Sequence, residues 1–228
     1  MSVAENFNVV MARIASAAKC AGRDPSSVRL VVVTKTIDRD RIREAVAAGA
    51  DILGENRVQE AKEKIEALGT EASWHLIGHL QTNKAKYAVK LFDLIHSVDN
   101  LELAEEIDKQ AAKRGKVQDI LIEVNIAGEA SKAGMAVKGT PALVAEVSRF
   151  KNVSVKGLMT MPPYFEDPES SRPYFSVLRE LAETIAKENI PNVSMQELSM
   201  GMSGDFEVAI DEGATLVRVG TAIFGERS

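Results

Sequence analysis

The chain has 228 residues, of which 45% are hydrophobic and 27% charged, a balance that is ordinary for a globular protein. The formal net charge is −5 and no basic stretch could neutralise a row of phosphates, so we expect no nucleic-acid partner. The single cysteine, Cys20, excludes an internal disulfide, and we interpret it as a small apolar filler of the first helix.

The first residues, Met1-Ser-Val-Ala-Glu-Asn-Phe-Asn, contain neither a positive segment nor an uninterrupted apolar run, so they do not predict a signal peptide. The longest apolar runs, such as Leu30-Val-Val-Val, are far too short to cross a bilayer. We therefore expect a cytoplasmic protein with no membrane partner.

Short runs rich in β-branched residues alternate with longer amphipathic stretches along the chain. An extra amphipathic helix is expected first, over 2–21. Eight strands are expected over 28–34, 51–53, 74–77, 94–97, 119–125, 153–160, 197–200 and 216–219. Each strand except the last precedes an expected helix, over 39–48, 58–68, 84–90, 101–114, 141–150, 170–188 and 206–212. The loop 161–173, with its prolines and acidic residues, is expected to be exposed.

Strands that alternate with helices predict parallel strands joined by crossover helices, and eight such units close into a (β/α)₈ TIM barrel. An open doubly wound sheet is the competing fold, but no G-x-G-x-x-G turn follows the first strand. We expect a single α/β domain over 1–228, with the helix at 1–22 packed on the barrel.

In this fold the active site lies at the carboxyl ends of the strands. The residues at those positions are polar or glycine-rich almost throughout: Lys35, Glu55-Asn56, Gly78-His79, Ser97, Asn125, Met159-Thr160, Ser199-Met200-Gly201 and Arg218-Val219-Gly220-Thr221. The amino ends show no such bias, and this asymmetry indicates a ligand-binding rim.

Lys35 ends the run Leu30-Val-Val-Val-Thr-Lys and is expected to point into or over the barrel. Desolvation there would lower its pKa and free the amine to form an imine with an aldehyde. A lysine whose stem packs along the strand end while its charge reaches water is the alternative, and position alone does not separate the two.

The loops after the last two strands resemble the phosphate site of such barrels. Backbone N–H groups of Gly220 and Thr221 are expected to bind a phosphate, and Ser203 could donate to the same group. Ser203 could instead cap the helix that follows, with Asp205 as another candidate cap.

Arg218 lies between two valines of the last strand, and a buried arginine needs a partner. It could pair with an internal carboxylate such as Glu55, or donate to a ligand atom. An arginine that faces a pyridine nitrogen keeps that nitrogen unprotonated and mutes carbanion chemistry.

The three histidines predict no metal site, because His75 and His79 do not converge on a strand and His96 stands alone. Trp74 is interpreted as a core residue. The acids Glu197, Asp205 and Glu207 are too scattered to indicate a glycosidase pair.

Eight segments together resemble the pyridoxal phosphate homeostasis family over nearly the whole chain. They are Val33-Thr-Lys-Thr, Gly54-Glu-Asn-Arg-Val-Gln-Glu, Trp74-His-Leu-Ile-Gly-His-Leu-Gln-Thr-Asn-Lys, His96-Ser-Val-Asp, Ser131-Lys-Ala-Gly, Gly157-Leu-Met-Thr-Met, Leu198-Ser-Met-Gly-Met-Ser-Gly-Asp-Phe and Val217-Arg-Val-Gly-Thr-Ala-Ile-Phe-Gly. The resemblance implies the barrel domain of alanine racemase-like proteins, standing alone.

The resemblance also implies a cofactor, pyridoxal 5′-phosphate (PLP), held as a Schiff base on Lys35. It implies phosphate contacts from Ser203, Gly220 and Thr221, and an approach of Arg218 to the pyridine nitrogen. The remaining positions implied to line the cofactor are Asn56, His79, Met159 and Met200. Lys132 matches a lysine proposed as a secondary contact, although Ala133 replaces a serine of that motif, and Arg57 stands where many relatives have tyrosine.

Three functions compete at this stage. The first is a PLP carrier in intracellular PLP homeostasis without robust catalysis, because a racemase needs a second acid/base that another domain and a partner chain help to supply. The others are an amino-acid racemase of low activity and a cofactor-free aldolase that uses Lys35. For the carrier, PLP-dependent apo-enzymes are the expected recipients and a monomer is the expected state.

Overall fold

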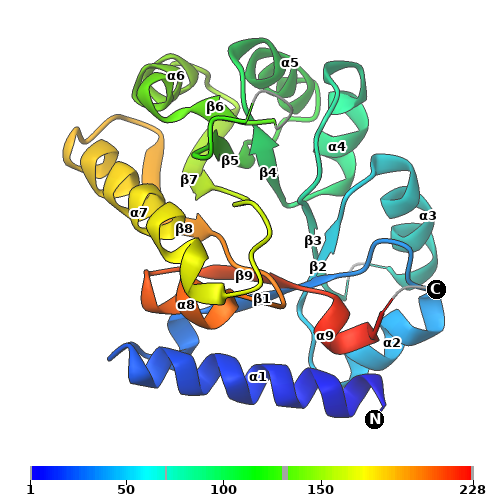
Figure 1. Ribbon diagram of the computed structural model, residues 1–228. Helices are drawn as coiled ribbons and strands as arrows, with labels where there is room; N and C mark the ends of the chain where they lie inside the picture. The colour runs from blue at the N-terminus through cyan, green and yellow to red at the C-terminus, as the bar shows by residue number, and fades with distance from the viewer. Residues whose placement is uncertain (1, 70, 130–132, 227–228) are drawn as a thin grey trace.

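The computed structural model describes residues 2–69, 71–129 and 133–226. Figure 1 shows parallel strands in a closed ring with helices outside it. The strands are β1 (Arg29–Val33), β2 (Ile52–Glu55), β3 (Ser73–Leu76), β4 (Leu94–Val98), β5 (Gln118–Asn125), β6 (Met135–Ala136), β7 (Val153–Met159), β8 (Val193–Ser199) and β9 (Leu216–Val219). The ring closes because β1 pairs with β9 and β4 pairs with β5, so the predicted eight-stranded barrel is confirmed.

The helices follow the strands in the expected alternation, except that the short α9 follows the last strand, where no helix was expected. They are α1 (Val3–Cys20), α2 (Arg39–Ala47), α3 (Val58–Leu68), α4 (Ala85–Leu91), α5 (Leu101–Ala112), α6 (Thr140–Val147), α7 (Arg172–Lys187), α8 (Phe206–Asp211) and α9 (Thr221–Phe224). Within the described residues, no helix is both long enough and apolar enough to cross a bilayer.

Two strands differ from the sequence expectation. β6 was not predicted, because a two-residue strand beside the end of β5 carries no recognisable hydrophobic pattern. β8 begins at Val193 rather than near residue 197, because its first residues are only half-buried and so lack the apolar run that marks a strand.

Helix α1 packs against α2, α8 and α9 below the barrel. Ser2 and Glu5 form a reciprocal capping box at its start, which fixes where the helix begins. Its buried side chains recur at helical spacing: Val3, Phe7, Val10, Ile14 and Ala18. Cys20 at its end is exposed, so the interpretation of this cysteine as an apolar filler is wrong.

Alternate residues of each strand face opposite sides of the barrel wall, and they form two separate apolar clusters. The larger cluster lies between strands and helices and includes Trp74, as expected. The smaller one fills the barrel interior with Val31, Ile52, Leu94, Leu121, Met159 and Leu216. The interior is therefore packed, and a ligand can enter only at a rim.

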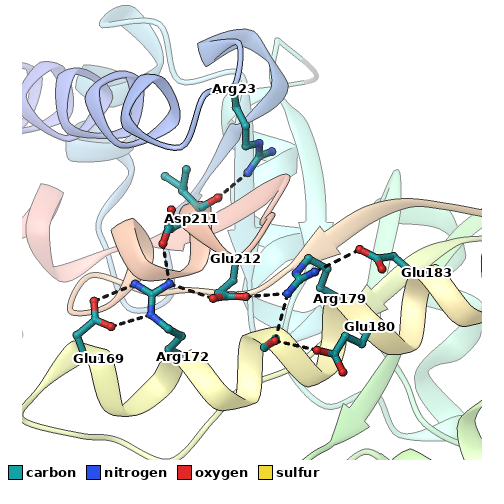
Figure 2. Close-up of polar contacts among 10 residues, drawn as sticks. Arg23, Glu169, Arg172, Arg179, Glu180, Glu183, Asp211 and Glu212 are labelled. Carbon is teal, nitrogen blue, oxygen red and sulfur yellow. Dashed lines mark hydrogen bonds and ion pairs between the residues drawn. The ribbon is translucent and has the colours of Figure 1, made fainter.

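On the outer surface, α7 and α8 are joined by a set of ion pairs that Figure 2 shows, here called the Arg172 network. Its members are Glu169, Arg172, Arg179, Asp211 and Glu212. Arg172 contacts three carboxylates at 2.6–2.9 Å, yet a third of its side chain remains exposed. Ion pairs in such contact with water contribute little to folding.

Candidate functional site

Two cavities lie at the carboxyl end of the barrel and share Lys35, Arg218, Val33 and Met202. One, of about 280 Å³, is lined by the loops after β7, β8 and β9, including Ser203, Gly204, Gly220 and Thr221. The other, of about 330 Å³, lies on the β2, β3 and β5 side and includes Asn56, His79, Glu123 and Asn125. Larger surface hollows elsewhere do not contain Lys35. The half-buried Lys35 therefore lies between two cavities. The first is lined by the loops with Ser203, Gly220 and Thr221, here called the phosphate-type loops, and the second is the polar cavity with Asn56 and His79.

The peptide groups on both sides of Lys35 are held by four residues, here called the Lys64 network: Thr34, Glu55, Glu60 and Lys64. Lys64 Nζ donates to the Thr34 carbonyl at 2.5 Å, and the backbone N–H of Thr36 donates to Glu60 Oε1 at 2.5 Å. Lys64 Nζ also lies 2.7 Å from both Glu55 Oε1 and Glu60 Oε1. Thr36 has a φ of 63°, in the left-handed region that non-glycine residues rarely adopt. The network therefore fixes the backbone direction from which Lys35 projects.

Burial and hydrogen bonding together set the pKa values of the two carboxyl groups in this network. It raises the pKa of Glu55, against the hydrogen bonds from Lys64 and Thr34 that favour the ionised form. Burial also acts to raise the pKa of Glu60, but hydrogen bonds from Lys64 and from the Thr36 backbone outweigh it and lower the pKa overall. Glu55 Oε2 is buried without a hydrogen-bond partner in the described structure. Lys64 therefore compensates two carboxylates at once.

The phosphate-type loops are joined by a direct contact, in which the Ala222 backbone N–H donates to Ser203 Oγ at 3.4 Å. Ser203 does not cap α8, and its hydroxyl faces the turn after β9 instead. Asp205 occupies the cap position without a side-chain cap bond, because its carboxylate accepts from the Met202 N–H and the Ser171 hydroxyl. Ser203, Gly220 and Thr221 thus line one cavity, the arrangement that a phosphate group needs.

Arg218 is 5% exposed and heads a chain of buried hydrogen bonds. It donates to Ser199 Oγ at 2.5 Å and to the Thr160 carbonyl at 2.9 Å. The expected alternative partner Glu55 belongs to the Lys64 network, so that pairing is wrong. Burial lowers the pKa of Arg218 to about 10, against the charges of Glu123 and Asp205, so the guanidinium stays charged at neutral pH.

The chain continues from Ser199 Oγ to His96 Nδ1 at 2.9 Å and from His96 Nε2 to His75 Nδ1 at 3.0 Å. Because Ser199 accepts from Arg218, its hydroxyl proton goes to His96 Nδ1, and His96 then donates from Nε2. Burial lowers the pKa of His75 to about 4 and that of His96 well below its ordinary value. The expectation that His96 stands alone is wrong, because it contacts both Ser199 and His75. In this chain of hydrogen bonds every donor points away from Arg218.

Seven of the nine predicted cofactor contacts line the two cavities: Lys35, Asn56, His79, Ser203, Arg218, Gly220 and Thr221. Met159 belongs to the interior apolar cluster and Met200 to the cluster between strands and helices, and neither lines either of these two cavities. Contact of these two residues with a cofactor stays a prediction. Lys132 lies outside the described residues, and Arg57 is exposed.

Several lining residues were not predicted from the sequence. Pro163, Tyr164 and Phe165 come from the exposed loop after β7, where no strand pattern indicates a site. Glu123 lies inside an apolar strand, two positions before Asn125 and therefore on the same inward face. The two-residue spacing between Glu123 and Asn125 is the sequence signal that could have identified Glu123 as a lining residue.

Residues 6–228 match the family described as alanine racemase, N-terminal domain. The pyridoxal phosphate homeostasis protein of Aquifex aeolicus is 49% identical over 228 residues, covering 100% of this chain and 99% of the relative. The Escherichia coli protein of the same name is 38% identical over 232 residues, covering 99% of this chain and 97% of the relative.

Two solved structures place the fold. PipY of Synechococcus elongatus PCC7942 with PLP bound has a TM-score of 0.82 at 39% identity, covering 93% of this chain and 100% of that chain. An alanine racemase of Clostridium difficile has a TM-score of 0.77 at 14% identity, and this chain matches 57% of its length, a likeness of fold alone. The chain therefore belongs to the pyridoxal phosphate homeostasis family, whose barrel is that of the alanine racemase N-terminal domain.

Proposed function

We propose that this protein binds PLP as a Schiff base on Lys35 and serves PLP homeostasis by storing, carrying or delivering the cofactor. The observation that carries this proposal is the position of Lys35 between a phosphate-type loop region and a second polar cavity. An aldehyde that carries a phosphate needs an amine and a set of backbone and hydroxyl donors within one molecule's length. The names of relatives and the PLP bound to PipY support the choice of PLP.

The residues of the site divide the work of holding the cofactor. Ser203, Gly220 and Thr221 hold the phosphate, and Lys35 holds the aldehyde carbon. Asn56 and His79 line the remaining space, with His79 exposed at the rim. When bound, PLP supplies an electrophilic carbon and an aromatic ring that accepts electrons.

We propose that the protein is not a robust enzyme. Arg218 remains a cation that Ser199 and Thr160 hold in place beside the cavities, and a fixed cation there opposes protonation of a pyridine nitrogen. The site thus favours reversible attachment of PLP over the formation of a carbanion on a substrate. PLP-dependent apo-enzymes are the recipients in this proposal, and a monomer leaves the rim open to them.

The test is the absorbance spectrum of the protein after loading with PLP. The wild type should show a yellow imine band, and borohydride reduction followed by peptide mass spectrometry should place the label on Lys35. Lys35→Ala should lose the band and the label entirely, whereas Lys90→Ala, at an exposed position of α4, should keep both. An unchanged band in Lys35→Ala would overturn the proposal, and amino-acid racemisation near 1 s⁻¹ would overturn the non-enzymatic part.

A further inference from the structure

Glu123 is a buried acid in the PLP cavity that the proposed function does not use. It lies near the end of β5 and is 7% exposed, and it lines the same cavity as Lys35, Asn56 and Arg218. Within residues 2–69, 71–129 and 133–226, no hydrogen bond or ion pair reaches its carboxyl group. A buried polar group that faces a cavity without a protein partner is in position to bind a ligand.

The charges around Glu123 come from four elements that meet at this cavity. Arg218 on β9 favours the ionised carboxylate, whereas Asp99, which follows β4, opposes it. Lys35 after β1 and His79 after β3 line the same cavity. Burial is the largest effect, and with Asp99 it raises the pKa of Glu123 to about 7 despite Arg218. At pH 7 a substantial fraction of the carboxyl group is therefore protonated and can donate a hydrogen bond, and this fraction grows below pH 7.

We propose that Glu123 is a further ligand-binding residue, which donates a hydrogen bond as a neutral acid to an acceptor atom on the ring side of a pyridoxal-type ligand. This inference rests on the proposed function, because it needs a ligand in the cavity. The ring side is assigned because Glu123 lines the β2, β3 and β5 cavity, whereas the phosphate-type loops line the other. Ionisation of Glu123 would remove the donor and also neutralise Arg218, so ligand binding should weaken as pH rises.

The experiment measures dissociation constants between pH 6 and pH 9 for PLP and for pyridoxal, which lacks the phosphate. The variants are Glu123→Gln, which keeps a donor without a titrating proton, and Glu123→Leu, which keeps neither. Asp119→Asn is the matched control, because Asp119 lies at the opposite end of β5 and pairs with Lys156 at 3.4 Å.

Relative to Glu123→Gln, the wild-type dissociation constant should rise with pH and approach about tenfold by pH 9, as the ionised form, which lacks the donor, comes to dominate. The same ratio should appear with pyridoxal, because Glu123 acts on the ring side. Glu123→Leu should bind about tenfold more weakly than Glu123→Gln at every pH, reflecting the lost donor. Asp119→Asn should follow the wild type.

A wild-type to Glu123→Gln ratio that stays constant from pH 6 to pH 9 would overturn the proposal. Equal binding by the Leu and Gln variants would overturn the donor role, and a ratio that varies with PLP but not with pyridoxal would overturn the ring-side assignment. A wild type that binds neither ligand at any pH would instead contradict the proposed function itself. The Gln comparison stands alone if Glu123→Leu fails to fold.

Discussion

Two ionic networks in this protein pair basic side chains with carboxylates in opposite surroundings. The Lys64 network lies inside the wall beside Lys35, where the side chains of Lys64 and Glu55 are 7% and 0% exposed. The Arg172 network lies on the outer surface of α7 and α8, where the side chains of Glu169 and Asp211 are more than half exposed (Figure 2). Both have pair distances near 2.7 Å, so distance alone does not distinguish them.

The difference in burial changes what each network contributes. Water and salt screen the Arg172 network, so its pairs exchange partners at little cost. The Lys64 network cannot exchange partners with water, and loss of one member leaves a buried charge. The Lys64 network also binds two backbone groups, the carbonyl of Thr34 and the N–H of Thr36. The buried charges therefore lie where the backbone direction is fixed, next to Lys35.

The largest expected effect comes from Lys64→Met, which leaves Glu55 and Glu60 without their cation. The free energy of unfolding of the cofactor-free protein should fall by about 3–5 kcal/mol, measured by urea denaturation at pH 7.5. The double variant Lys64→Met/Glu55→Gln removes the stranded charge as well and should regain part of the loss. A loss below about 1 kcal/mol in the single variant would show that Lys64 is not needed to compensate the buried acids.

A second effect concerns acid stability and the neutral histidine chain. The pKa of His75 is about 4 in the folded protein and 6.5 unfolded, so stability is present above pH 6.5 and is lost as pH falls toward 4. Glu123, whose folded pKa of about 7 exceeds its ordinary 4.5, gives the opposite trend across the same range. In the wild type, the plot of unfolding free energy against pH therefore shows only the sum of two contributions that partly cancel.

His75→Asn isolates the histidine term, because an amide oxygen can replace Nδ1 as acceptor from His96 and does not titrate. The difference in unfolding free energy between variant and wild type should change by about 3 kcal/mol in favour of the variant between pH 7 and pH 4. Urea titrations at half-unit pH steps measure it. A difference independent of pH would mean that His75 takes up a proton without cost in the folded protein.

The smallest effect is expected from Arg172→Gln on the surface. The Tm should fall by under about 2 °C at low salt, and most of that loss should vanish in 1 M NaCl, where screening acts within about 3 Å. Differential scanning calorimetry at both salt concentrations measures it, with Lys64→Met as the comparison whose loss should persist at high salt. A salt-independent loss in Arg172→Gln would remove the distinction between the two networks.

The fold was predictable because strand and helix periods alternate clearly, and the carboxyl-end rule then placed Lys35, Arg218 and the phosphate-type loops on one rim. The hydrogen-bond partners were not predictable in the same way. Which carboxylate contacts Lys64 depends on how α3 packs on the barrel wall, and which hydroxyl contacts Arg218 depends on the pairing of β8 with β9; hydrophobic periodicity reveals neither. The contact between His96 on β4 and Ser199 on β8 arises only when the ring closes.

The hydrogen bonding of the first strand to the last has a consequence for biosynthesis. Residues 29–32 of β1 pair with 216–219 of β9, and the two loops that line the phosphate-type cavity follow β8 and β9. A nascent chain therefore exposes Lys35 long before the ribosome releases the segment that completes its binding site. The cofactor proposed for this site could therefore be captured only after β8, β9 and their loops have been made, so shorter nascent chains would not compete for the cellular supply.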